Sequence, residues 1–368
     1  MIHKPAPRLD VDLEKVHHNA LTLVDRLRKR GIAVTGVTKS TLGSPEIAKT
    51  WLRAGVHGLG DSRIENIERM RGSRILTPMT LIRSPMLSQV DEVVALTNVS
   101  FNTEITVIRK LSAAAKKADC IHGVVLMVEL GDLREGIMPR LLKKAVREVL
   151  GLSNLLFMGI GTNLACRSGV SPNRKNMCEL SALANSIDAA FGPIVNTVSG
   201  GNSANLDWAF SGTEVGRVND LRLGEALLLG CEPLHRKIIK GLHTSAITLV
   251  AEVIELKNKP SKPWGEIAQN AFGEVVTSRK QGFTNQAILA IGRQDIEPDG
   301  LIPPAGIKIL AASSDHLIVD VGNYHGMMTV GTEVSFQLNY SALLRAMTSP
   351  FIPQIMQRPQ MKLLTTKR

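Results

Sequence analysis

The sequence predicts an α/β protein, with a (β/α)8 barrel over residues 1–235 and a mostly β domain over residues 236–368. Two observations favour this fold. From residue 8 to about residue 230, short apolar runs alternate with amphipathic helical patterns, which is typical of parallel strands joined by crossover helices. After about residue 235, strand-like runs follow one another with no long amphipathic helix between them.

The composition is that of a globular protein with a large core. The chain has 368 residues, of which 44% are apolar and 21% charged, and this length favours two domains over one. No unbroken apolar stretch is long enough to span a bilayer, and the start, MIHKPAPRLDVDLEK, lacks the apolar segment of a signal peptide. We therefore expect a cytoplasmic protein that does not enter a membrane.

The cysteines and the net charge argue against two other classes of protein. Cys120, Cys166, Cys178 and Cys231 are scattered with no CxxC pair, so we expect free thiols and no metal site. A net charge of +11 raises the hypothesis of nucleic-acid binding. However, the basic residues are mostly dispersed, and 4% aromatic content leaves few side chains to stack on bases. We do not expect a nucleic-acid partner. The tail from Pro350 carries Arg358, Lys362, Lys367 and Arg368 with no acid, and it could simply be mobile.

The first barrel elements show helix and strand signals in turn. One apolar stripe at helical spacing is formed by Leu13, Val16, Ala20, Val24 and Leu27. Gly31 ends this helix, and IAVTGVTK follows as a buried strand. In SPEIAKTWLRAG, Ser44 can cap a second helix that starts at Pro45 and ends before Gly55.

The alternation then repeats to the end of the first domain. Further strands are predicted at HGLGD, ILTPMTLI, VVALTNVSF, VVLMVEL, LLFMGIGTNL and IVNTVSGG. About eight such units before residue 232 fit a closed barrel better than an open doubly wound sheet. In the second domain, strands are predicted at SAITLVAEVIEL, AILAIGR, IKILAASSDHLIVDV and GTEVSFQLNY.

The functional residues of a parallel barrel lie at the carboxyl ends of its strands. Polar residues close the predicted strands at Lys39, Asp61, Arg83, Asn102, Arg134, Asn163, Asn202, Ser203 and Arg222. Lys39 has the most informative chemistry, because a lysine at the end of an apolar strand needs a partner or must be held neutral. A neutral lysine is a nucleophile towards carbonyl groups. The alternative is a lysine whose ammonium group reaches out to water at the rim of the barrel.

The segment SGGNSAN offers a second functional feature. Its small residues let backbone N–H groups face an anion ahead of a helix that begins at Ser203. Helix capping by Ser203 alone would also explain this segment, and Arg134 and Arg222 could equally be structural ion-pair residues.

Segments along nearly the whole chain, from about residue 8 to residue 352, resemble the alanine/ornithine racemase group of pyridoxal-phosphate enzymes. The resemblance rests on VTKS, GDSRIENI, LGDLREGI, GTNLAC, SGGNSANL, LRLGEALLLG, AILAIGRQDIEPDGLIP, ASSDHLI and LNYSALLRAMTSPF. It implies a (β/α)8 barrel plus a β domain, pyridoxal 5′-phosphate as cofactor, a free amino acid as substrate, and a head-to-tail homodimer whose sites use both subunits.

The resemblance also implies roles for individual residues. Lys39 resembles the lysine that binds the cofactor as a Schiff base and exchanges a proton on one face of the substrate Cα. Arg222 resembles the arginine at the pyridine nitrogen, which it keeps unprotonated. Phosphate-binding positions correspond to Ser203, in the turn with Asn202, and to Gly224, the backbone N–H of Glu225, and Tyr340.

Four further site positions follow from the same resemblance. Arg134 lies where the family has an arginine beside the phenolic oxygen of the cofactor, within reach of substrate. Asn163 falls where alanine racemases have a histidine against the ring. Ser314 and Asp315 resemble positions that reach the substrate carboxylate from the partner subunit.

The sequence departs from alanine racemase at the second proton donor. Alanine racemase uses a tyrosine from the β domain, whereas the comparable segment here, KPSKPWGEIAQNAFGE, has none. Asp315, His316 and Tyr324 are the remaining candidates, and histidine exchanges protons most readily near neutral pH. The substrate is therefore left open among ornithine, lysine and alanine. A decarboxylase, a D-amino-acid lyase and a non-catalytic cofactor carrier are the alternatives.

Overall fold

The computed structural model describes residues 5–273 and 281–357, and its contacts divide the chain into two units. One unit runs from Leu13 to Thr244 and contains the barrel. The other combines the segment that ends at Asp12 with the segment that begins at Ser245. The four basic residues of the tail predicted from Pro350 lie in its last part, from Arg358, which is outside the described residues.

The first unit is a closed parallel barrel. Its strands pair in chain order, and β2 pairs with β9 to complete the ring. The strands are β2 (Ala33–Val37), β3 (Gly58–Asp61), β4 (Met79–Leu81), β5 (Val99–Asn102), β6 (His122–Met127), β7 (Leu155–Gly161), β8 (Thr197–Ser199) and β9 (Asp220–Leu223). This closure confirms the predicted barrel over an open doubly wound sheet.

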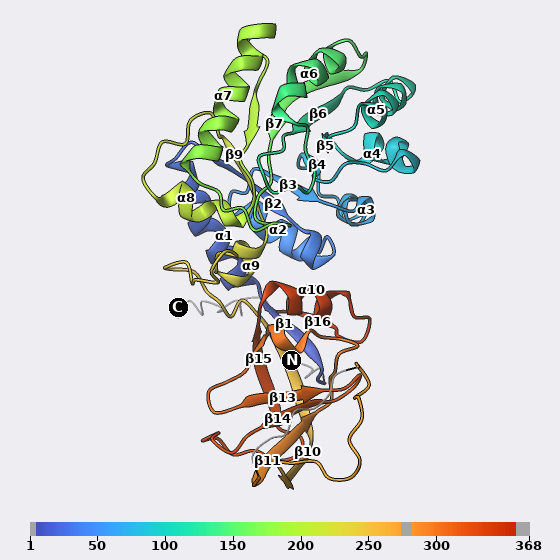
Figure 1. Cartoon of the computed structure of the whole chain (residues 1–368). Coiled ribbons are helices and arrows are strands. Elements are labelled where there is room, and N and C mark those ends of the chain that lie inside the picture. Colours follow the sequence, from blue (N-terminus) through green and yellow to red (C-terminus); the bar gives the residue numbers. More distant parts are fainter. Residues whose placement is uncertain (1–4, 274–280, 358–368) are drawn as a thin grey trace, which may run out of the picture. The chain divides into compact units, whose positions relative to one another are not determined.

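Helices surround the barrel strands, as Figure 1 shows for α3 to α7. The helices are α1 (Leu13–Arg28), α2 (Pro45–Arg53), α3 (Ile64–Gly72), α4 (Val90–Leu96), α5 (Ile105–Lys117), α6 (Leu142–Leu150), α7 (Arg174–Phe191), α8 (Leu206–Phe210) and α9 (Glu225–Leu229). The whole apolar stripe predicted for α1 is buried. The second helix begins at Pro45 as predicted, although the Ser44 side chain makes no capping bond.

The segment VVALTNVSF is not the single strand that its composition suggests. Its first part lies in α4, and only the residues from Val99 form β5. Val93 and Val94 are the buried face of this helix, and the hydroxyl of Thr97 donates to the Val93 carbonyl near its end. A short apolar run suits a buried strand and a buried helical face equally well, so periodicity could not separate them.

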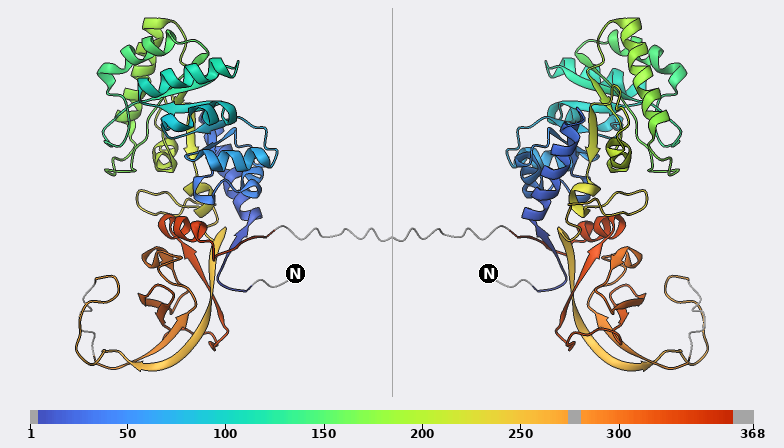
Figure 2. Two further views of the ribbon diagram at one scale, coloured as in Figure 1. Left: turned by 90° about the vertical axis from the view of Figure 1, so that its right-hand side faces the viewer. Right: turned by 90° about the vertical axis from the view of Figure 1, so that its left-hand side faces the viewer.

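The second unit is a mainly antiparallel sheet accompanied by the helix α10 (Tyr340–Thr348), which confirms the predicted β character. Its strands are β1 (Arg8–Asp12), β10 (Ile247–Pro260), β11 (Phe283–Leu289), β12 (Leu301–Ile302), β13 (Lys308–Ala312), β14 (Leu317–Asp320), β15 (Glu333–Leu338) and β16 (Gln354–Gln357). The path of pairing is β12-β15-β10-β11-β14-β13, and Figure 2 shows the long curve of β10 in yellow and orange.

Strand β1 belongs to this sheet, although it lies within the range expected for the barrel domain. It pairs antiparallel with β10 and parallel with β16. Leu9 and Val11 alternate with polar residues and are fully buried, while Arg8 donates to both carboxylate oxygens of Glu333 at 2.6 and 2.8 Å. Five residues that alternate between polar and apolar predict a strand, but this pattern does not indicate which sheet the strand joins.

Among the described residues, the helices are all too short or too polar to cross a membrane.

Candidate active site

Arg222 is a buried cation at the carboxyl end of the barrel. It lies on β9, is only 5% exposed, and stacks on the ring of Phe101 at 5.0 Å. Its guanidinium donates to the Ser199 hydroxyl at 2.5 Å and to the Thr162 carbonyl at 2.7 Å. Burial lowers the pKa of Arg222, and the nearby Asp220 carboxylate opposes this change. Arg222 therefore joins the ends of three strands around a fixed positive charge.

Asn163 and Asn202 lie beside Arg222, and the structure brings these three predicted residues together. The Asn163 amide oxygen accepts bonds from Arg222 at 3.3 Å and from the Asn202 amide at 3.1 Å. The Asn163 amide nitrogen donates to the thiol sulfur of Cys166 at 3.0 Å, and Asn202 lies 3.6 Å from the same sulfur. Cys166 is an exposed member of the site that sequence reasoning missed. Its position three residues after Asn163 was a weak signal.

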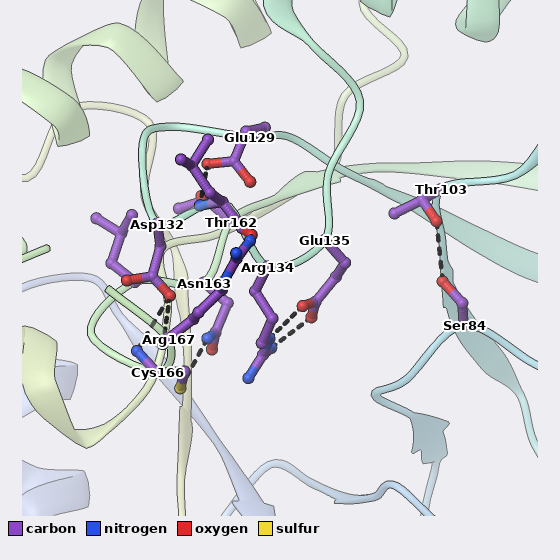
Figure 3. Close-up of polar contacts among 12 residues, drawn as sticks. Ser84, Thr103, Glu129, Asp132, Arg134, Glu135, Thr162, Asn163, Cys166 and Arg167 are labelled. Atoms are coloured by element: carbon purple, nitrogen blue, oxygen red, sulfur yellow. Dashed lines mark hydrogen bonds and ion pairs between the residues drawn. The ribbon is translucent and has the colours of Figure 1, made fainter. Parts of the chain in front are cut away.

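Arg134 lies on the loop after β6, and Figure 3 shows how this loop is fastened. Its guanidinium pairs with the carboxylate of the next residue, Glu135. The buried Asp132 carboxylate accepts backbone N–H bonds from Cys166, Arg167, Ser168 and Val170, all on the loop after β7. The loops that carry Arg134 and Asn163 are therefore joined through one aspartate, which the sequence did not single out.

The SGGNSAN segment forms the turn that the sequence predicted. Asn202 caps the short helix η4 (Ser203–Asn205), where its side chain accepts the Ala204 N–H at 2.8 Å. The buried Ser203 hydroxyl accepts the Ala226 N–H at 3.2 Å, which ties this turn to the first turn of α9. Gly224 precedes α9, and a Cβ there would lie 2.9 Å from the Val37 carbonyl oxygen. The helix starts at Ser203 and Glu225 therefore lie together at the ends of β8 and β9, and Gly224 packs closely against the end of β2 at Val37.

Lys39 begins the short helix η1 (Lys39–Thr41), directly beyond the end of β2. Lys39 is an exposed residue in the single chain. Glu225, the first residue of α9, pairs with Arg236 and is mostly buried. Burial raises the pKa of Glu225, and the charges of Arg236 and Lys39 act against that rise. Lys39 and Glu225 are therefore electrostatic neighbours.

The remaining predicted residues lie in the second unit. Ser314, Asp315 and His316 form the exposed turn between β13 and β14. The His316 N–H donates to the Ser313 hydroxyl at 3.2 Å, so His316 is in a turn and is not packed on a strand. Tyr340 is the half-buried first residue of α10, and Asn339 caps that helix. Their roles stay predictions.

One cluster of metal-ligand type occurs among the described residues, formed by Asp207, Glu232 and His235. Their ligand atoms lie within 4.8 Å of one another. Both oxygens of the buried Glu232 already accept backbone N–H bonds, from Leu234, His235 and Lys237. Glu232 is thus engaged in holding the turn after α9, and we assign no metal there.

The barrel followed by a mainly antiparallel β unit is the fold of solved alanine racemases. The structure of alanine racemase from Streptomyces lavendulae superimposes with a TM-score of 0.75 and 18% identity, covering 97% of this chain and 99% of that one. A D-threonine aldolase from Filomicrobium marinum has the same fold, with a TM-score of 0.74 and 17% identity over 93% of this chain and 88% of its own.

The model of the alanine racemase N-terminal domain matches residues 11–232, and the chain belongs to this family. It is 37% identical over 350 residues to the lysine racemase of Thermotoga maritima, covering 95% of this chain and 98% of that protein. It is 36% identical over 348 residues to the ornithine racemase of Acetoanaerobium sticklandii, covering 94% and 98%. These relatives support an amino-acid racemase, an isomerase, over the alternatives that the sequence left open.

Proposed function

We propose that the protein binds pyridoxal 5′-phosphate on Lys39 and racemises a free amino acid, ornithine or lysine in preference to alanine. The observation that carries this proposal is the match, over nearly the whole chain, to a lysine racemase and an ornithine racemase. We also propose that the protein works in the cytoplasm, and its four free cysteines are consistent with this location.

The residues at the barrel mouth fit such a cofactor. The joined helix starts at Ser203 and Glu225 offer backbone N–H groups to a phosphate, and Gly224 leaves room for close approach. Arg222 offers a permanent donor to the pyridine nitrogen. Lys39, at the end of the neighbouring strand β2, supplies the amine for covalent attachment.

The bound cofactor would withdraw electrons from the substrate Cα and make its proton acidic. The chain's own residues then control how that proton moves. Since a guanidinium can donate but cannot accept a hydrogen bond, Arg222 favours an unprotonated pyridine nitrogen and moderates the electron withdrawal. This suits a reaction that only removes and returns one proton. The Lys39 amine takes and returns the proton on one face of Cα.

Racemisation also needs a proton donor on the opposite face. We propose that Asp315 or His316 supplies it from the second unit of the partner in a head-to-tail homodimer, with Ser314 and Asp315 near the substrate carboxylate. Asn163, Asn202 and Arg134 would contact the cofactor ring, and Tyr340 would complete the phosphate site. The exposure of Ser314, Asp315 and His316 in one turn is consistent with this proposal.

The test combines a spectrum with a chiral assay. Purified protein loaded with pyridoxal 5′-phosphate should absorb visible light, and Lys39→Ala should lose that band. Lys49→Ala, an exposed lysine on α2, is the matched control and should retain it. L-Ornithine, L-lysine and L-alanine in D2O should give α-deuterated D-enantiomers. A colourless wild-type protein would contradict the cofactor, and consumption of substrate without inversion would indicate a lyase or a decarboxylase instead.

A further inference from the structure

A buried carboxylate, Asp61, lies beside the candidate site and has no part in the function proposed above. It is the last residue of β3 and is fully buried. One oxygen accepts the Thr38 hydroxyl at 2.7 Å, and the other accepts the Arg63 N–H at 2.9 Å and the Asn66 amide at 3.1 Å. All three of these donors are uncharged groups. Burial raises the pKa of Asp61, although these hydrogen bonds oppose the rise. An ionised carboxylate there therefore costs stability.

The first partner of Asp61 fixes the chain just before Lys39. Thr38 is fully buried, and its N–H donates to the Gly60 carbonyl at 2.9 Å. Its carbonyl accepts the Thr41 hydroxyl at 3.0 Å and the Gly43 N–H at 3.2 Å. With the hydroxyl bound to Asp61, each polar group of Thr38 is engaged. The residue that precedes Lys39 is thus held on every side.

Asn66, another hydrogen-bond donor to Asp61, packs against the chain just after the Lys39 turn. Leu42 and Gly43 have left-handed backbones, with φ of 53° and 64°. A Cβ on Gly43 would lie 2.6 Å from the Asn66 carbonyl oxygen, so the turn closes directly against Asn66. A non-glycine residue such as Leu42 keeps a left-handed backbone only when its surroundings hold it there. Asp61 thereby contacts both residues that clamp the turn, Thr38 at its start and Asn66 at its end.

We propose that Asp61, acting through Thr38 and Asn66, is the positioning residue for Lys39. This inference rests on the proposed function, in which Lys39 carries the cofactor. The lysine side chain is long and flexible, so the backbone at Lys39 decides where the amine can reach. A displacement of about 1 Å at a reacting group can slow a reaction by ~100-fold. Burial of the Asp61 carboxylate thus lowers the stability of the fold, while its hydrogen bonds hold the backbone that positions the Lys39 amine.

The test measures how fast apoprotein captures pyridoxal 5′-phosphate at Lys39. Capture is followed by growth of the visible band and, after borohydride reduction, by mass spectrometry of the Lys39 peptide. Thr38→Val removes the hydroxyl with almost no change of shape and should slow both capture and kcat by about tenfold or more, with little change in KM. Thr38→Ser keeps the hydroxyl and should recover most of both rates.

Two controls separate positioning from folding. Thr50→Val removes another buried threonine hydroxyl, which donates to the Glu46 carbonyl at 2.8 Å within α2, and should leave capture unchanged. Because the folded-state pKa of Asp61 is raised, its stabilising contribution is present below the ordinary carboxyl pKa and is lost as pH rises through the folded value. At a pH above the folded-state pKa of Asp61, Asp61→Asn should therefore slow capture without lowering the thermal unfolding temperature.

A double-mutant cycle decides whether Asp61 acts through Thr38. In a Thr38→Val background, Asp61→Asn should slow capture much less than it does alone. This inference alone would be overturned if the fold-reductions in capture rate of the two single variants multiplied in the double variant. It would also be overturned if Thr38→Val captured cofactor as fast as the wild type. A wild-type protein that captures no cofactor at Lys39 would overturn the proposed function, and this inference with it.

Discussion

At the scale of single residues, the Cys166 thiol lies within the candidate site and can be used to detect whether that site is occupied. Its sulfur accepts a hydrogen bond from Asn163 and lies close to Asn202, two residues proposed to contact the cofactor. The Cys166 residue is exposed, so a small electrophile can reach its thiol when no cofactor is bound. Occupation of the site should therefore be visible as protection of one cysteine.

We expect pyridoxal 5′-phosphate to protect Cys166 from alkylation by N-ethylmaleimide. At a cofactor concentration ten times its Kd, the rate at Cys166 should fall about tenfold, because only unoccupied protein reacts. Mass spectrometry of the Cys166 peptide measures this rate. Cys178 is an exposed thiol on α7 and serves as the internal control, whose rate should not change. Equal rates at Cys166 with and without cofactor would place the cofactor elsewhere.

At the scale of elements, the Asp132 carboxylate joins the loop after β6 to the loop after β7 through four hydrogen bonds. Burial disfavours ionisation of this carboxylate, but its four backbone N–H bonds outweigh burial and hold the pKa of Asp132 below the usual value. Since the folded-state pKa is lowered, the stabilising contribution is complete above the ordinary carboxyl pKa. It is lost as pH falls through the folded value.

Asp132→Asn should accordingly lower the free energy of unfolding at neutral pH by about 2 kcal/mol, since an amide accepts fewer hydrogen bonds and carries no charge. The difference from the wild type should shrink in acid, where Asp132 is protonated. Urea unfolding at a series of pH values measures both effects. Asp25→Asn, at an exposed ion pair with Arg28, is the control and should show no such difference. A pH-independent difference for Asp132→Asn would contradict the assignment.

The elements also show which local patterns carried information. The α1 stripe, the start of α2 at Pro45 and the turn before a helix that begins at Ser203 could be predicted from the sequence, because each depends on residues within a few positions of one another. The capping side chain of that turn is Asn202, and not Ser203 as the sequence had suggested. The boundary between α4 and β5 could not be predicted, because apolar residues such as Val93 and Val94 suit a buried helical face and a buried strand equally well.

At the scale of the whole molecule, the proposed site needs residues from both units of the chain. Lys39 and Arg222 lie in the barrel unit, whereas Asp315 lies in the second unit. In the proposed head-to-tail homodimer, each barrel would meet the second unit of its partner. This arrangement can be tested by combining two damaged subunits.

A hybrid of one Lys39→Ala subunit and one Asp315→Ala subunit should recover about half of the wild-type activity, because one of its two sites is intact. Differently tagged subunits allow the hybrid to be purified, and the chiral assay measures its activity. The control hybrid joins Lys39→Ala to Arg222→Ala, two barrel defects that leave neither site intact, and should stay inactive. An inactive test hybrid would show that each site is built within one chain.

The sequence by itself determined the fold class and the strand ends at which Lys39, Ser203 and Arg222 lie. It could do so because alternating apolar runs and helices permit few architectures, and because a parallel barrel gathers its functional residues at one end. Only the tertiary structure decided that β1 joins the second sheet, that Arg222, Asn163 and Cys166 meet, and that the Asp61 carboxylate accepts a hydrogen bond from the Thr38 hydroxyl. Those contacts join residues distant in the sequence, and they exist only once barrel closure or sheet pairing has brought the segments together.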